Sequence, residues 1–145
     1  MKENDCYTKF RGWLQAKLTV PHYTYHPGQQ GFFDPTKGRF ITTAYERPDM
    51  FAFVNGYGCV LEFKVYRNKK KLWTPEWQKA QGESQWNFYQ KICGATDVFW
   101  IIYKEDVRHQ GGMPDIIYHQ NSGISIMPEM WIANLQKVRS CIVNS

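Results

Sequence analysis

Residues 48–66 read PDMFAFVNGYGCVLEFKVY, and this stretch decides the fold. Residues 49–54 and 57–66 are two β-prone runs joined by Asn55-Gly56. Asn-Gly between apolar runs strongly predicts a two-residue hairpin, because a type I′ turn requires positive φ at both central residues. The runs are apolar on both faces, which is typical of strands that are covered on both sides. The stretch therefore predicts a hairpin in the middle of a sheet flanked by helices.

Helices and further strands are expected on both sides of this hairpin. Residues 3–18 place apolar side chains near helical spacing, and Pro21 ends that helix. Residues 22–38 are rich in Pro, Gly and polar residues and predict an irregular loop that could include a short strand, and residues 39–45 predict a strand. After the hairpin we expect a helix over 74–94, a strand over 97–104, a turn at Gly111-Gly112, short strands over 115–119 and 124–127, and a final helix over 128–138.

This order of elements predicts a single mixed α/β domain spanning residues 1–145. Aromatic residues make up 17% of the chain, more than a disordered protein carries. No apolar run approaches the length of a membrane span, and the N-terminus is too polar for a secretory signal. We therefore expect a cytoplasmic protein with no membrane contact.

Cysteine and histidine give no strong metal-binding signal. No pair of cysteines forms Cys-x-x-Cys, so free thiols are favoured over the alternative of a four-cysteine iron–sulfur site. His22 and His26 stand four apart, as helical metal ligands do, but Pro21 and Pro27 argue against a helix there. The cysteines are Cys6, Cys59, Cys93 and Cys141.

The hairpin register predicts a reactive site. A two-residue turn at Asn55-Gly56 makes Asp49 face Glu62, with Cβ atoms about 5 Å apart. Two carboxylates this close repel each other unless a cation or a shared proton intervenes. Oxygen ligands favour a hard ion such as Mg²⁺ or Mn²⁺, and the carbonyl of Phe63 could complete the set. Lys64 is two residues past Glu62 and therefore points to the same face.

This set of groups suits phosphodiester hydrolysis. A metal ion polarises a phosphoryl oxygen and lowers the pKa of a bound water. Lys64 can orient that water and counter the negative charge of the transition state. The net charge of +5 is compatible with a phosphate-rich partner. A basic run after the second strand is either a solvated loop or an edge that contacts phosphates; its members are Arg67, Lys69, Lys70 and Lys71.

Pro48-Asp49, followed after twelve residues by Glu62-Phe63-Lys64, resembles the motif of the PD-(D/E)XK nuclease superfamily. The resemblance implies an αβββαβ restriction-endonuclease-like core over about 3–104, with an appendage over about 105–145. It also implies Mg²⁺-dependent or Mn²⁺-dependent hydrolysis of DNA, with Asp49, Glu62 and Lys64 as catalytic residues.

Two weaker matches extend the resemblance. Gln85 with Tyr89 resembles the Gln-x-x-x-Tyr motif of one branch, which makes Gln85 a catalytic candidate, with Gln81 and Gln78 as rivals. The alternative is that these glutamines are ordinary helix-surface residues. Many members place an extra acidic ligand on the first helix; the candidates here are Glu3, Asp5 and Glu46.

The chain is similar to small stand-alone members such as Holliday junction resolvases and virus-type replication–repair nucleases. This implies structure-selective cutting of branched or flapped DNA by a homodimer, in replication, recombination or repair. It also implies a protein of a prokaryotic cell, or of a virus or phage in its host cell. Three alternatives stay open: an inactive DNA-binding module of the same fold, an RNA-directed nuclease, and a structural protein.

Overall fold

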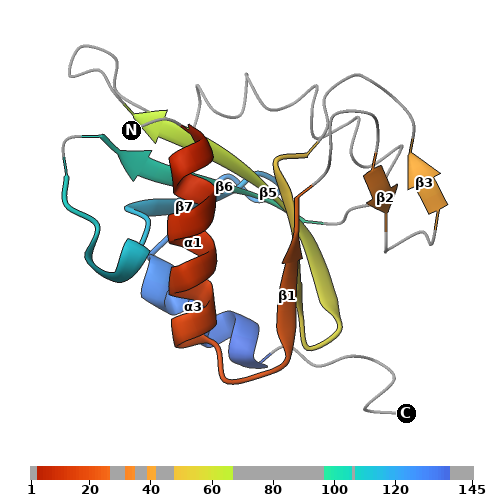
Figure 1. Ribbon diagram of the computed structural model, residues 1–145. Coiled ribbons are helices and arrows are strands. Elements are labelled where there is room, and N and C mark those ends of the chain that lie inside the picture. Colours follow the sequence, from red (N-terminus) through yellow and green to blue (C-terminus); the bar gives the residue numbers. More distant parts are fainter. Residues whose placement is uncertain are drawn as a thin grey trace.

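The computed structural model describes residues 3–26, 32–34, 39–41, 48–66, 97–105 and 107–137 (Figure 1). Their main feature is a six-stranded sheet in the order β1-β4-β5-β6-β7-β8. The elements are α1 (Glu3–Lys17), β1 (His22–Tyr25), β2 (Phe32–Asp34), β3 (Arg39–Ile41), β4 (Met50–Val54), β5 (Tyr57–Tyr66), β6 (Val98–Lys104), the 3-10 helix η1 (Gln110–Gly112), β7 (Ile116–His119), β8 (Ile124–Ile126) and α3 (Pro128–Lys137).

The sheet is mixed, as expected for an α/β protein. β5 and β6 pair in parallel, whereas the other four neighbouring pairs are antiparallel. A parallel pair needs a crossover connection between its strands, and here residues 67–96 make that connection outside the described part. The predicted helix over 74–94 lies within this connection.

The predicted hairpin is confirmed in both its turn and its register. Asn55 and Gly56 have φ values of 50° and 88°, as a type I′ turn requires. The paired residues run from Val54↔Tyr57 to Met50↔Leu61. The ladder therefore stops one pair before the expected pair of Asp49 with Glu62.

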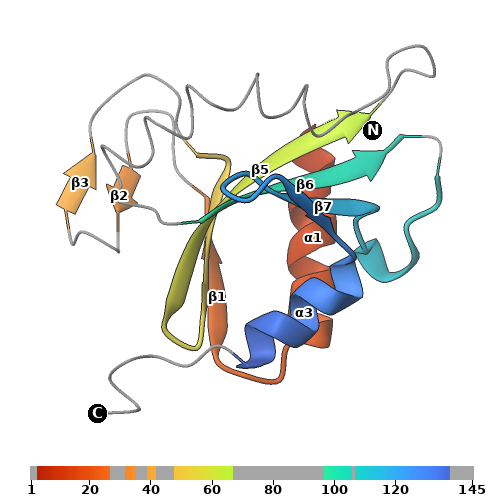
Figure 2. The same cartoon turned by 180° about the vertical axis from the view of Figure 1, so that it is seen from behind.

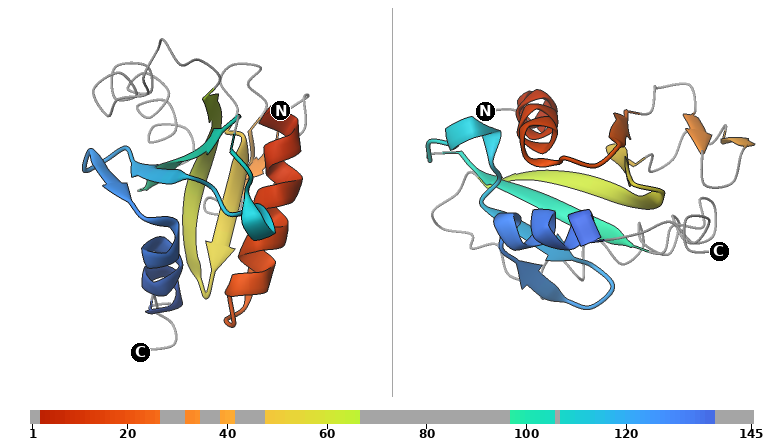
Figure 3. Two further views of the ribbon diagram at one scale, coloured as in Figure 1. Left: turned by 90° about the vertical axis from the view of Figure 1, so that its left-hand side faces the viewer. Right: turned by 90° about the horizontal axis from the view of Figure 1, so that it is seen from below.

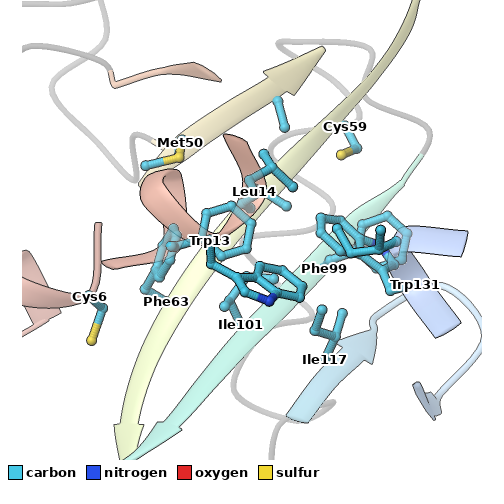
Figure 4. Packing of buried hydrophobic residues seen from close by; sticks show 14 of the residues in the cluster. Cys6, Trp13, Leu14, Met50, Cys59, Phe63, Phe99, Ile101, Ile117 and Trp131 are labelled. Carbon is cyan, nitrogen blue, oxygen red and sulfur yellow. The ribbon is translucent and has the colours of Figure 1, made fainter. Parts of the chain in front are cut away.

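Both described helices contribute to a core on one face of the sheet. The apolar positions of α1 that the sequence placed near helical spacing are all buried, and α3 adds Trp131 from the other end of the chain. The rings of Trp13 and Trp131 stack with centroids 6.4 Å apart, and Figure 4 shows both side chains above the sheet. The buried residues of α1 and the following loop are Cys6, Phe10, Trp13, Leu14 and Leu18.

The opposite face of the sheet carries a smaller apolar cluster. Trp100, Ile102 and Tyr118 are buried there. The indole N–H of Trp100 donates to Oε1 of Gln120 at 2.7 Å. Both faces of the central strands are thus apolar, as the sequence of the hairpin predicts.

The chain after residue 104 continues the same sheet and the same core. β7 pairs with β6, β8 pairs with β7, and Trp131 of α3 contacts Phe99 of β6. The sheet twists strongly, so β7 runs at a steep angle to β4 and β5 (Figure 3). The short strands and the last helix expected from the sequence are confirmed, and Val138 lies outside the described part.

The region before the hairpin differs from the expectation. β1 lies in a segment predicted as mainly irregular loop, yet it pairs with β4 and forms an edge of the main sheet. β3 is the described part of the strand expected over 39–45. It pairs with β2 in a separate two-stranded sheet beyond β1 (Figures 1 and 2). The strand expected over 39–45 is thus confirmed in its described part, whereas composition alone did not identify β1, because a short strand is stabilised by its partner.

Neither helix in the described part of the chain is long and apolar enough to cross a membrane.

Candidate functional site

Asp49 stands immediately before β4, and its side chain binds the backbone of β5. Its Oδ2 accepts a hydrogen bond from the N–H of Phe63 at 2.8 Å. The main-chain ladder ends at Met50↔Leu61, and in a continued ladder Phe63 would face Pro48. The Asp49 carboxylate therefore replaces a main-chain acceptor at the end of the hairpin. This contact joins Asp49 to the residue that lies between Glu62 and Lys64.

Glu62 is the one charged residue that is fully buried in the described part of the chain, with 5% of its surface exposed. It lies in β5 beside Trp100 of β6. A buried carboxylate is costly unless other groups compensate for lost hydration. Burial of a carboxylate at the motif position is typical of functional sites as well as of structural ion pairs.

Lys64 lies on the same face of β5 as Glu62, because side chains alternate along a strand. It is half-buried, beside Ile102 of β6. This face is opposite to the one that α1 covers, since Leu61, Phe63 and Val65 belong to the α1 core. Glu62 and Lys64 thus share the face of the sheet that is opposite to α1.

The backbone of Phe63 fits the role expected of its carbonyl. The N–H and C=O of one strand residue point to the same side of the strand, and the N–H of Phe63 points to Asp49. The ring of Phe63 is buried in the core, edge-on to Phe10 at 5.2 Å and to Tyr7 at 4.9 Å. The side chain therefore anchors the strand, and the carbonyl stays on the Asp49 side.

Tyr7 and His26 support Asp49 from the α1 side, and sequence analysis did not connect either residue with the site. Nδ1 of His26 lies 2.7 Å from the main-chain O of Asp49. A carbonyl only accepts, so Nδ1 donates, and Nε2 is the acceptor nitrogen of the neutral ring. The ring centroid of His26 lies 4.9 Å from that of Tyr7. This contact depends on β1 pairing with β4, which the sequence did not reveal.

The donors at this site suit a hard divalent cation. Asp49, Glu62 and the Phe63 carbonyl offer only oxygen, as Mg²⁺ prefers. In the described part of the chain, no three His, Cys, Asp or Glu side chains form a group that could hold a metal ion. Mg²⁺ usually keeps several waters and needs few protein ligands. The residues present therefore fit Mg²⁺ or Mn²⁺ held partly by water.

Several candidate residues lie outside the described part of the chain or lack a described side chain. Asp5 is exposed on α1. The backbone of Glu3 begins α1, and its side chain is not described. The residues outside are the catalytic candidate Gln85 with Gln78, Gln81 and Tyr89, the basic run Arg67, Lys69, Lys70 and Lys71, the acidic candidate Glu46, and Cys93 and Cys141.

A second polar cluster surrounds Asp97, just before β6. Its Oδ1 lies 2.7 Å from Nε2 of His119, and its Oδ2 accepts from the Tyr57 hydroxyl at 2.6 Å. The hydrogen bond from His119, followed by that from Tyr57, lowers the pKa of Asp97 against the opposing effect of its burial. Burial is also the largest cause of the raised pKa of Tyr57. These contacts hold the ends of β5, β6 and β7 together.

The described cysteines do not form a cluster. Neither Cys6 nor Cys59 forms a disulfide, and both side chains are buried. Burial raises the pKa of the Cys59 thiol far above its usual value. Such a thiol is a structural group with little nucleophilic character.

No protein-family model, no curated protein and no solved structure matches this chain.

Proposed function

We propose that the protein is a metal-dependent nuclease that hydrolyses DNA phosphodiester bonds at Asp49, Glu62 and Lys64. The observation that carries the proposal is the hydrogen bond from the N–H of Phe63 to Asp49. It links the aspartate of the motif directly to its acid-x-lysine triplet, across two strands. We also propose that the chain has the αβββαβ nuclease core, with a crossover helix between β5 and β6.

The roles of the residues follow from their chemistry. Asp49, Glu62 and the carbonyl of Phe63 would hold Mg²⁺ or Mn²⁺, which supplies charge to polarise the phosphodiester and acidify water. The Lys64 ammonium orients the attacking water and offsets the negative charge that grows on the phosphate. His26 donates to the main-chain O of Asp49 and positions that residue. Gln85 is proposed to assist Lys64, and the basic run from Arg67 to Lys71 to contact phosphates.

A cleavage assay tests the proposal. The wild-type chain is incubated with linear, flapped and four-way DNA in Mg²⁺, Mn²⁺ or EDTA. We expect cutting with either metal and none with EDTA, and faster cutting of the branched or flapped substrates. Glu62→Gln should abolish cutting, and Lys64→Met should slow it about 100-fold or more while DNA affinity is retained. Glu129→Gln removes an exposed acid on α3 and should cut normally.

Two results would overturn the proposal. A folded Glu62→Gln variant that cuts at the wild-type rate would exclude this site. A wild-type chain that binds DNA but cuts none of the substrates in either metal would favour the inactive binding module. RNA substrates in the same assay test the RNA-directed alternative. Sedimentation of the chain with and without four-way DNA tests the proposed homodimer, which suits the symmetry of a junction.

A further inference from the structure

Four aromatic rings form a continuous stack across β1 and β4, which we call the aromatic ladder: Tyr23, Tyr25, Phe51 and Phe53. Tyr23 and Phe53 face each other with centroids 4.9 Å apart and planes 21° apart. Tyr25 and Phe51 are stacked at 6.3 Å, and so are Phe51 and Phe53 along β4. The register of β1 and β4 places each tyrosine directly opposite its phenylalanine.

The aromatic ladder occupies the same face of the sheet as the candidate site. Phe51 pairs with Val60 on β5, and Glu62 and Lys64 follow at the next two positions of that face. The core face is the other one, because Ala52, Val54 and Leu61 pack there. Tyr23, the exposed ring of the aromatic ladder, is thus on the same face of the sheet as Glu62.

The aromatic ladder opens to solvent at β1. Phe51 is 1% exposed, Phe53 is half-buried and Tyr23 is 54% exposed. In the part of the chain that the structure describes, β1 is the edge strand of the six-stranded sheet, so no further strand of that sheet pairs with it beyond Tyr23. Cross-strand aromatic pairs stabilise a sheet by themselves, but an exposed ring at the open end also leaves a stacking surface available.

A polar hollow adjoins the exposed end. It lies between α1 and β1, has a volume of about 280 Å³, and is lined by Arg11, Gln15 and Tyr23 together with Leu14, His22 and Thr24. Arg11 is exposed on α1 and lines this hollow on the α1 side of β1, whereas the Tyr23 ring lies against Phe53 on the other side of that strand. A flexible single strand that turns around the edge of β1 would meet both groups, and base stacking together with phosphate contact is the way in which proteins bind single-stranded nucleic acid.

We infer that the aromatic ladder, together with Arg11, binds unpaired nucleotides of a DNA strand and delivers that strand to the candidate site. This rests on the proposed nuclease function and adds the class of substrate to it. Bases of a duplex are already stacked on each other, whereas an unpaired base gains a stacking partner on Tyr23. The net charge of +5 favours a polyanion over an uncharged partner. The preferred substrate is therefore DNA with a single-stranded segment.

Equilibrium binding in EDTA tests the inference without any cleavage. Fluorescence anisotropy measures the Kd of the full chain for labelled oligo(dT) of about 15 nucleotides and for a duplex of the same length. Tyr23→Ala should raise the Kd for oligo(dT) about 5-fold to 100-fold and leave the duplex Kd unchanged. Tyr23→Phe keeps the ring and should stay within about twofold of wild type. Arg11→Gln should weaken binding and lower the salt dependence by about one counterion.

Two further variants serve as controls. Tyr23→Leu keeps apolar contact with Phe53 and should fold as wild type, yet it should bind oligo(dT) as weakly as Tyr23→Ala. Ile124→Ala removes an apolar side chain that is 59% exposed on β8, at the opposite edge of the sheet, and should change nothing.

The inference is overturned if the Tyr23→Leu variant binds oligo(dT) as the wild type does. It is equally overturned if this variant loses affinity for oligo(dT) and for the duplex by the same factor. It is also overturned if Tyr23→Leu changes the sedimentation of the chain, which would make the aromatic ladder an interface between two copies. Failure of the nuclease proposal looks different: the wild type then binds oligo(dT) through Tyr23 and cuts nothing. If the Tyr23→Leu variant cuts DNA and binds oligo(dT) as the wild type does, only this inference is overturned and the nuclease proposal stands.

Discussion

At the scale of single residues, Asp49 combines a structural contact with a proposed chemical one. Its Oδ2 accepts the hydrogen bond of Phe63 that the main-chain ladder leaves unmade, and its own carbonyl accepts from His26. A buried N–H without an acceptor costs about 1–3 kcal/mol. Removal of the carboxylate would thus affect stability and activity together, unless the substitution keeps an acceptor.

Two variants of Asp49 separate these effects. Asp49→Asn keeps an oxygen that accepts from Phe63, so we expect near-wild-type stability together with loss of cleavage. Asp49→Ala should lose cleavage and also about 1–3 kcal/mol of unfolding free energy. Urea unfolding and the cleavage assay measure the two quantities. Equal destabilisation by Asn and Ala would show that the charge of Asp49, and not its acceptor oxygen, holds the hairpin end.

Asp97 gives a prediction for the pH dependence of stability. Its pKa is lowered in the folded state, chiefly by the hydrogen bond from His119. A carboxylate whose pKa is lower in the folded state stabilises the fold at pH values above its unfolded pKa of about 3.9. This contribution to the free energy of unfolding is lost as the pH falls through the folded pKa. The stability difference between wild type and Asp97→Asn should therefore shrink as the pH falls from about 5 towards 3. Thermal unfolding of both proteins across this range measures it, and a difference that grows on acidification would contradict the assignment.

At the scale of the elements, local chemistry accounts for the helices and strands that the sequence predicted correctly. The hairpin needs only positive φ at Asn55 and Gly56 and a matching apolar pattern on each side. α1 needs only an apolar stripe at helical spacing. β1 has neither signal, and its four residues become a strand because β4 offers them a partner.

The η1 turn allows a matched test of close packing. Gly111 and Gly112 have φ values of 65° and 81°, so both favour glycine. A Cβ on Gly112 would lie 2.3 Å from the main-chain O of Lys9, whereas a Cβ on Gly111 would have no atom within 4 Å. Gly111→Ala should cost about 1 kcal/mol of unfolding free energy, and Gly112→Ala about 1–3 kcal/mol more. Denaturant unfolding measures both; equal losses would show that η1 can move away from α1.

At the scale of the whole molecule, the two ends of the chain share one core. The Trp131 ring of α3 stacks on Trp13 of α1 and contacts Phe99 of β6. The residues expected as an appendage thus pack against the first helix and the central sheet. A core assembled from both ends of the chain should unfold as one unit.

Trp131→Ala tests this unity. We expect a loss of about 3–5 kcal/mol in unfolding free energy, because a large ring leaves a cavity at the contact of α1, α3 and β6. Met130→Ala changes the neighbouring residue, which is 58% exposed, and should cost much less. Far-ultraviolet circular dichroism and tryptophan fluorescence should report one coincident transition for the wild type. An early loss of α3 alone in the wild type would contradict a shared core.

The sequence by itself determined the elements whose signals are local. These are the two described helices, the hairpin with its register, and the strands that follow, because periodicity and turn chemistry act over a few residues. It also indicated the three residues of the proposed site, through the spacing of a motif. The tertiary structure decided the relations between distant segments: β1 at the edge, His26 against Asp49, Asp49 on the N–H of Phe63, and Trp131 on Trp13. Such contacts depend on how twisted strands pair and where helices pack, and these choices are made by the whole chain at once.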